Sequence, residues 1–290
     1  MGKKKKKVLA VLLILAIATV SVGCSSQNST ANSEKSNNTT SGVSSAADSN
    51  TAASKNGTAG KVMTVDEFNT FIKDYVDISH YHDSGSSDTT VSLALEKQYA
   101  PKYQTSKDIH LFSDKGFTID GGTKVKMDMK MSELLDQGWS FANEATKEDV
   151  LGANLINLSY FIKKNGKELK VSSVNHEDKE VKYPETCLDS IECPIYSSDY
   201  NYAEKSKNAV DFDFDGKINQ NSDLKDFISA LGEPDSVMYS RHVDENGTAE
   251  YSDASILLTY RDSGQGEYDF RLSCDGSKVV SFSVRRQVNG

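Results

Sequence analysis

Residues 255–285 read SILLTYRDSGQGEYDFRLSCDGSKVVSFSVR, and this stretch decides the class of fold. Apolar and polar residues alternate along it in three runs, which is the period of strands that bury one face and expose the other. Asp275 and Gly276 form a turn signal between the last two runs. Strands joined by such short connections predict an antiparallel meander. The three runs are residues 255–260, 268–274 and 279–285.

A shorter motif precedes this meander and occurs twice in the chain. FTIDG at 117–121 and FDFDG at 212–216 are each followed by a short amphipathic run that ends at a glycine, Gly138 or Gly232. A glycine in this place supplies the left-handed cap of a helix C-terminus. The apolar positions of the two runs match at a constant offset of 93 residues. The pattern therefore predicts two copies of one unit.

The predicted fold class is α+β, with tandem repeats of a short helix packed on an antiparallel β-meander. The first repeat is expected over 109–206 and the second over 207–290. An N-terminal helical segment is expected over 61–108, where the apolar spacing predicts a helix at 65–77. Residues 91–99 are compatible with helix or strand, and helix is favoured.

The start of the chain has the layout of a secretory signal peptide. Five lysines at 3–7 are followed by an apolar stretch over 8–22 and then by Gly23 and Cys24. The apolar stretch is shorter than the about 20 residues that a membrane-spanning helix needs. We therefore expect residues 1–23 to be a cleaved signal peptide, and the alternative is an uncleaved signal anchor.

The residues around the expected cleavage point resemble the lipobox of bacterial lipoproteins. In that family the chain is cut before a cysteine whose sulfur carries a diacylglycerol, and Leu is usual at the position that Ser21 occupies here. The resemblance implies cleavage after Gly23, lipid and palmitate on Cys24, and a place at the extracytoplasmic face of the cell membrane. Two acyl chains hold a protein stably at a membrane, whereas one chain binds only marginally.

Residues 24–60 are expected to be a disordered tether that starts at the lipidated Cys24. Ser, Thr and Asn occupy 21 of the 36 positions after it, and Val43 is the only branched aliphatic residue among them. Such a segment cannot bury enough apolar surface to offset its ordering entropy.

The segment around Gly232 carries a second resemblance. A helix ending in LGEPD at 231–235, followed by a strand, is similar to the tandem α+β modules of envelope lipoproteins of the SmpA/OmlA type and of the β-lactamase-inhibitory-protein fold. In that fold two helix-plus-sheet units form a concave surface. The resemblance implies a scaffold that binds proteins, on the strength of fold alone.

The charge of the chain excludes nucleic acid as a partner. Loss of the five leader lysines lowers the formal net charge from −9 to −14. A chain this acidic lacks the basic face that binding to nucleic acid requires.

Three cysteines remain besides Cys24. The sequence allows either a Cys187–Cys193 disulfide or three free thiols. The spacing of Cys187 and Cys193 disfavours a zinc knuckle.

The strongest candidate for a binding site is DFDFDGKI at 211–218. It matches the first eight positions of an EF-hand loop, with Asp211, Asp213 and Asp215 as carboxylate ligands, but Ser222 replaces the bidentate Glu at the twelfth position. The alternative interpretation is a strand, with the phenylalanines inward and the aspartates in water. We expect no metal here.

Two other candidates are weaker. His80 and His82 lie close together in the sequence, and we interpret them as surface histidines, with a metal site as the alternative. We interpret Trp139 as a core residue, with a binding anchor as the alternative. No nucleophile, phosphate-binding or cofactor motif is recognised, so the sequence predicts no catalytic residues and no cofactor.

The sequence therefore predicts a membrane-anchored lipoprotein of the cell envelope that displays a non-catalytic, protein-binding α+β domain. Its expected partner is an envelope or extracellular protein. Two alternatives are kept: an extracytoplasmic hydrolase acting on cell-wall material, and a calcium-dependent adhesion or sensor module that uses Asp211, Asp213 and Asp215.

Replacing the lipid-bearing cysteine tests the anchor. Cys24→Ala should release the protein from the membrane fraction or block its processing, because the thioether to the lipid cannot form. Fractionation, fatty-acid labelling and the mass of the mature chain are the measurements, with Ser25→Ala as the control. Unchanged membrane attachment and unchanged mature mass of Cys24→Ala would contradict the prediction.

Overall fold

The computed structural model describes residues 61–99, 116–197, 202–262 and 266–286. The chain divides into two units, 1–52 and 53–290, and all the described residues belong to the second. The expected signal peptide and tether at 1–60, with Gly23 and Cys24, lie outside the described residues. None of the described helices is long and apolar enough to cross a membrane.

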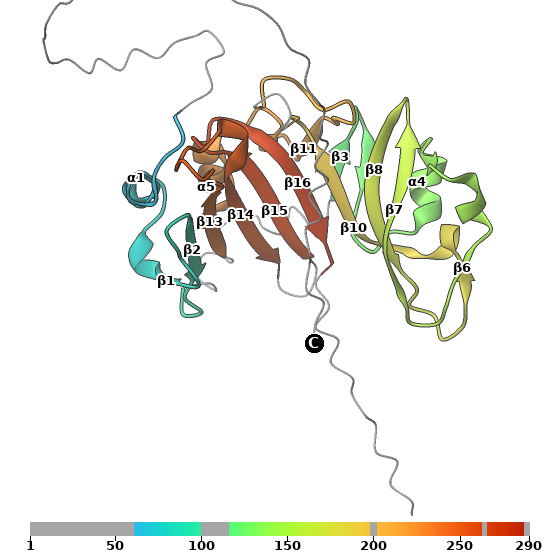
Figure 1. Ribbon diagram of the computed structural model, residues 1–290. Helices are drawn as coiled ribbons and strands as arrows, with labels where there is room; N and C mark the ends of the chain where they lie inside the picture. Colours follow the sequence, from blue (N-terminus) through green and yellow to red (C-terminus); the bar gives the residue numbers. More distant parts are fainter. Residues whose placement is uncertain (1–60, 100–115, 198–201, 263–265, 287–290) are drawn as a thin grey trace, which may run out of the picture. The chain divides into compact units, whose positions relative to one another are not determined.

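Ten of the described strands form one antiparallel sheet, in the order β1-β2-β13-β14-β15-β16-β10-β8-β7-β5. Figure 1 shows β13 to β16 side by side, with β10, β8 and β7 continuing the sheet beyond β16. The strands are β1 (Tyr81–Asp83), β2 (Thr90–Leu95), β5 (Ser140–Phe141), β7 (Ile156–Lys164), β8 (Lys167–Val174), β10 (Cys187–Pro194), β13 (Ser236–Arg241), β14 (Ala254–Asp262), β15 (Gly266–Ser273) and β16 (Val279–Arg285).

Two hairpins form a second sheet, in the order β12-β11-β3-β4, and a two-stranded ribbon pairs β6 with β9. The hairpins join where Phe212 of β11 lies opposite Ile119 of β3. These strands are β3 (Phe117–Ile119), β4 (Thr123–Val125), β6 (Val150–Leu151), β9 (Val181–Lys182), β11 (Phe212–Phe214) and β12 (Ile218–Asn219).

The described α-helices are short and capped by their own side chains. In α5, Asp223 accepts a hydrogen bond from the Asp226 amide at 2.9 Å and Asp226 accepts one from the Asp223 amide at 3.1 Å, a reciprocal box that satisfies two free amides. The helix ends at Gly232, whose φ is 85°. The α-helices are α1 (Val65–Phe71), α4 (Met131–Asp136) and α5 (Leu224–Leu231), and the 3₁₀ turns are Ile72–Asp74, Ile78–His80, Glu144–Lys147, Tyr183–Glu185 and Tyr251–Asp253.

An aromatic cluster joins the two sheets and α5. Phe270 of β15 is fully buried, and its ring centroid lies 4.7 Å from that of Phe227 in α5 and 5.6 Å from that of Phe214 in β11. Phe282 of β16 lies 4.5 Å from Phe212 by the same measure. The apolar face of the large sheet therefore packs against the small sheet and α5, which leaves its other face free of this core.

The turn between β15 and β16 also fixes α5. The amide of Leu224, the first residue of α5, donates to the Gly276 carbonyl at 2.9 Å. Gly276 has φ of 70°, and a Cβ there would lie 3.0 Å from the Leu224 Cβ. Only glycine suits both the left-handed conformation and this close approach.

The predicted fold class is wrong. The expected repeats, each with a helix on its own meander, would keep two separate sheets, but the strands after both helices belong to one ten-stranded sheet. The described α-helices have only seven, six and eight residues, so helix is a minor part of the fold. Alternation shows which side of a strand is buried but not which strand edges pair. Here β10 and β16, which end the two expected repeats, pair with each other.

Two expectations for the N-terminal segment also change. Helix α1 ends at Phe71 and continues only as a 3₁₀ turn to Asp74. The stretch expected to be helical at 91–99 instead holds the strand β2, which pairs with β1 and β13. Only Val91 and Leu95 are buried, and their spacing of four residues is compatible with either state, so pairing with β13 selects the strand.

Truncation of Phe270 should destabilise the fold more than truncation of a half-exposed phenylalanine. Phe270→Ala removes a fully buried ring and should cost about 3–5 kcal/mol of unfolding free energy. Phe161→Ala, whose residue is 50% exposed, is the matched control and should cost about 1 kcal/mol. Urea unfolding of both variants is the measurement. Equal losses would show that the aromatic cluster is not the core of the fold.

Candidate functional site

The free face of the large sheet is polar because of strand alternation. Along β15, Tyr268, Phe270 and Leu272 are buried in the core, so the residues between them, Asp269 and Arg271, point to the opposite side. We call this opposite side the outer face. Strand register places its side chains in rows that run across six strands.

Three rows cover the outer face from β14 toward β7. In each row the residues are direct partners on neighbouring strands, so their side chains are in reach of one another. The first row is Arg261, Glu267, Arg285, Ser190 and Ser172; the second is Thr259, Asp269, Ser283, Glu192, Lys170 and Phe161; the third is Leu257, Arg271, Ser281 and Pro194.

Glu267 holds the first row together. Its carboxylate accepts hydrogen bonds from Arg261 Nε at 2.8 Å and from Arg285 Nε at 3.0 Å, and the residue is only 8% exposed. Burial acts to raise the pKa of Glu267, but the hydrogen bonds from Arg285 and Arg261 outweigh it and lower that pKa below its ordinary value. The carboxylate therefore stays charged and bridges β14, β15 and β16.

The second row contains a different kind of carboxyl. Asp269 accepts a hydrogen bond from Thr259 Oγ1 at 2.7 Å, and none of the ion pairs among the described residues includes it. Burial raises the pKa of Asp269 above its ordinary value, against that hydrogen bond. Farther along the row, Lys170 Nζ lies 2.9 Å from Glu192 Oε1, and both side chains are largely exposed.

A groove of about 700 Å³ lies along the second and third rows. Its described lining combines aromatic and aliphatic side chains with charges of both signs. Tyr196 and Tyr202 approach from the segment after β10, where Lys278 Nζ lies 4.9 Å from the centroid of the Tyr196 ring. We call it the groove, and its principal residues are Phe161, Glu168, Lys170, Glu192, Tyr196, Tyr202, Leu257, Asp269, Arg271, Ser281 and Ser283.

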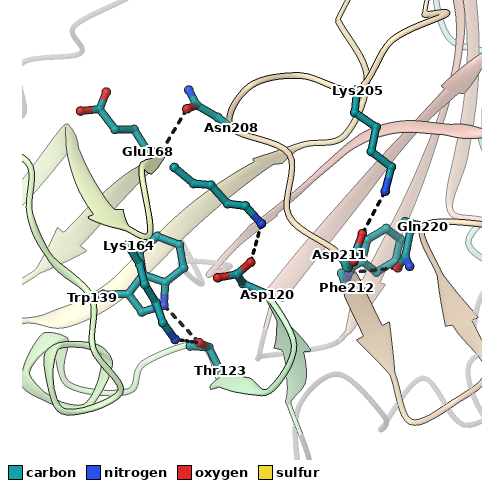
Figure 2. A network of polar contacts seen from close by, with 11 residues as sticks. Asp120, Thr123, Trp139, Lys164, Glu168, Lys205, Asn208, Asp211, Phe212 and Gln220 are labelled. Atoms are coloured by element: carbon teal, nitrogen blue, oxygen red, sulfur yellow. Dashed lines mark hydrogen bonds and ion pairs between the residues drawn. The ribbon is translucent and has the colours of Figure 1, made fainter.

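A polar network ties β4 and the segment before β11 to β7 and β8 of the large sheet, and Figure 2 shows its contacts. Trp139 Nε1 donates to Thr123 Oγ1 at 3.2 Å, and Lys164 Nζ donates to the same oxygen at 2.9 Å. The Glu168 amide donates to Asn208 Oδ1 at 3.1 Å, which ties the segment before β11 to β8. Trp139 is 3% exposed, so its interpretation as a core residue is confirmed.

The EF-hand-like segment is a strand. Phe212 and Phe214 are buried, and the aspartates lie on the other side of β11 or in its turn. Asp211 pairs with Lys205 at 3.3 Å, as Figure 2 shows, and Asp213 Oδ1 accepts a hydrogen bond from the Gly216 amide at 2.7 Å. In the described part of the chain, Asp211, Asp213 and Asp215 do not form a convergent group of ligands.

The two candidate histidines have separate partners. His80 Nδ1 lies 3.0 Å from Glu233 Oε2, and His80 Nε2 lies 3.4 Å from Asp77 Oδ2. His82 faces Glu96 at 3.7 Å, with its side chain 53% exposed. His80 thus joins the N-terminal segment to the residue that follows the end of α5.

The three described cysteines are free thiols. Cys187 and Cys193 are the first and seventh residues of the single strand β10. Six residues of strand span about 20 Å, whereas the Cα atoms of a disulfide lie within about 7 Å. The extended strand therefore excludes a disulfide between them, and of the two alternatives the structure has the free thiols.

Sequence reasoning missed the groove. The outward residues of each strand could be read from alternation, but their assembly depends on the order of the strands. Glu192 and Asp269, for example, are joined only through Ser283 of β16.

Comparison with family models, with curated proteins and with solved structures yields no match. The lipobox resemblance and the resemblance to the SmpA/OmlA and β-lactamase-inhibitory-protein modules therefore stay predictions from the sequence.

Without the charge of Glu267, the free energy of unfolding should fall less as the pH is lowered into the acid range. The pKa of Glu267 in the folded chain lies below its ordinary value of 4.5, so its contribution is complete above pH 4.5 and is lost as the pH falls further. Glu267→Gln should cost about 1.5–3 kcal/mol at neutral pH, because hydrogen bonds to a charged group are lost.

The cost should shrink below pH 4.5, where Glu267 of the parent chain also becomes neutral. Urea unfolding at neutral and acid pH measures both effects. Glu192→Gln is the control, since its exposed pair with Lys170 contributes about 0–1 kcal/mol. A cost of Glu267→Gln that is the same at both pH values would refute this account of the row.

Proposed function

We propose that this protein is a lipid-anchored protein of the bacterial cell envelope that binds a protein partner in the groove on its outer face. The carrying observation is the composition of the groove. It brings Phe161, Tyr196, Tyr202 and Leu257 together with the charged Lys170 and Arg271 on one open side of the sheet. Aromatic residues and arginine are the residue types enriched in protein interfaces and in their hot spots.

Rigidity of the scaffold also supports binding. The groove lies on strands that are paired on both sides, and its side chains are held by cross-strand hydrogen bonds, such as that from Arg271 Nη1 to Ser255 Oγ at 2.8 Å. A preordered surface loses little conformational entropy when a partner binds. Six strands contribute to the outer face, which suits a partner that buries an interface of ordinary size, about 800 Å² on each side.

The charges of the groove favour a partner segment with both signs. Glu168, Glu192 and Asp269 lie along it with Lys170 and Arg271. Such a surface distinguishes its partner from other proteins by complementary charge pairs, and it attracts other charged proteins only weakly. In this proposal the lipid on Cys24 and the polar tether at 24–60 present the groove outside the membrane, at a distance of up to about 120 Å along a stretched chain.

The hydrolase alternative has less support. A glycoside or peptide hydrolase needs an acid and a base that converge on one bond. In the groove, the Glu192 carboxylate is paired with Lys170 and the Asp269 carboxylate accepts a hydrogen bond from Thr259, so both are engaged with structural partners. The calcium alternative requires Asp211 as a ligand, and Lys205 lies beside that carboxylate.

Reversal of one charge in the groove tests the proposal. Detergent-solubilised full-length protein is immobilised and exposed to envelope extract, and captured proteins are identified by mass spectrometry. Arg271→Glu should reduce the capture of the specific partner at least about tenfold, the effect of a hot-spot residue.

Lys225→Glu is the matched control, because Lys225 is exposed on α5, which packs on the opposite side of the sheet. Circular dichroism confirms that both variants are folded. The proposal is wrong if nothing is captured by the parent chain, or if Arg271→Glu and Lys225→Glu capture the same proteins in the same amounts.

A further inference from the structure

Asp128, His176 and Cys187 converge at one point away from the groove. One carboxylate oxygen, one imidazole nitrogen and the thiol sulfur all lie within 4.8 Å of one another. His176 Nε2 lies 2.7 Å from Asp128 Oδ1. Within the described ranges no other group of three His, Cys, Asp or Glu side chains converges in this way. The side chains come from three segments: the turn between β4 and α4, the loop after β8, and the first residue of β10.

Backbone hydrogen bonds hold two of these segments together. The Asp128 amide donates to the Leu188 carbonyl at 3.0 Å, and the Leu188 amide donates to the Met129 carbonyl at 2.8 Å. Cys187 also pairs with Val174 at the end of β8. The carboxylate and the thiol are therefore placed by a ladder on both sides of β10, not by mobile side chains alone.

The loop that carries His176 is fixed as well. The side-chain amide of the preceding Asn175 is buried, and its Nδ2 donates to the carbonyls of Leu151, Gly152 and Lys179 at 2.8–3.0 Å. Its Oδ1 accepts a hydrogen bond from the Glu177 amide at 2.9 Å. His176 itself is exposed, with 40% of its side chain accessible, so an ion can reach it from solvent.

The donor set suits a borderline-soft divalent cation. Thiolate sulfur, imidazole nitrogen and carboxylate oxygen are the three ligand types of Zn²⁺, at about 2.0–2.3 Å from the metal. In a tetrahedral site such ligands lie about 3.3–3.8 Å from one another. The described atoms lie within 4.8 Å of one another, and the closer pair, His176 Nε2 and Asp128 Oδ1, is 2.7 Å apart, so a metal bound here would take the place of that hydrogen bond.

A cysteine nucleophile uses the same residue types but needs a thiolate without a metal. Here His176 Nε2 lies 2.7 Å from Asp128 Oδ1, so this nitrogen is engaged with the carboxylate and not with the thiol, as a general base would be. Metal binding would displace the thiol proton.

We propose that Asp128, His176 and Cys187 form a zinc site with three protein ligands and a fourth position open to water. The signal was invisible along the chain because the histidine lies 48 residues after the aspartate. The site is independent of the groove, and either proposal can fail without the other.

The test uses the full-length chain under reducing conditions, with Zn²⁺ in calorimetry and Co²⁺ as a spectroscopic probe. We expect one bound Zn²⁺ per chain, release of protons on binding, and a thiolate-to-cobalt charge-transfer band in the near ultraviolet. His176→Ala should weaken Zn²⁺ binding at least about tenfold, since even a lost outer-shell partner has an effect of this size.

Matched controls separate the site from surface binding. His82→Ala removes another exposed histidine and should keep the affinity and the cobalt band. Cys187→Ser should abolish the band. If Cys187→Ser fails to fold, Asp128→Asn, at an exposed side chain, gives the decisive loss of affinity. The proposal is overturned if the parent chain binds no stoichiometric Zn²⁺, or if His176→Ala and His82→Ala bind it equally.

Discussion

The pairing of β10 with β16 is the constraint on which the rest of the structure depends. Ile191 lies opposite Val284 and Cys193 opposite Phe282 on the core side, while Glu192 lies opposite Ser283 on the outer side. One ladder therefore satisfies two strand edges, continues the apolar core and aligns the polar rows. Without it the two halves of the large sheet would each expose a row of unpaired backbone groups, and the groove would have no floor.

The apolar core on one side of β15 and the ion pairs on its other side both stabilise the position of this strand. The aromatic cluster around Phe270 sets the position of β15 against α5 and the small sheet. On the other side of the same strand, Glu267 bridges two arginines from β14 and β16. The core fixes where β15 lies, and the ion pairs fix how its neighbours are spaced. A binding surface built on such strands keeps its shape without help from loops.

Local patterns predicted local elements well and their assembly poorly. The capped run ending at Gly232 became α5, and the alternating runs at 255–285 became β14, β15 and β16. Of the two interpretations of residues 211–218, the strand is correct, because Phe212 and Phe214 are buried. The stretch at 91–99 misled, because a few apolar residues fit two periods and the partner strand β13 makes the selection.

The sequence by itself determined the three strands of the C-terminal meander with their buried sides, the helix that ends before Gly232 and the acidic charge, because caps, turns and alternation act over a few residues. The tertiary structure alone decided the ten-stranded order, the groove and the meeting of Asp128, His176 and Cys187. These depend on pairing between segments tens of residues apart, such as β10 with β16. Edge pairing is governed by backbone hydrogen bonds that every residue type except proline offers, so side-chain patterns carry little information about it.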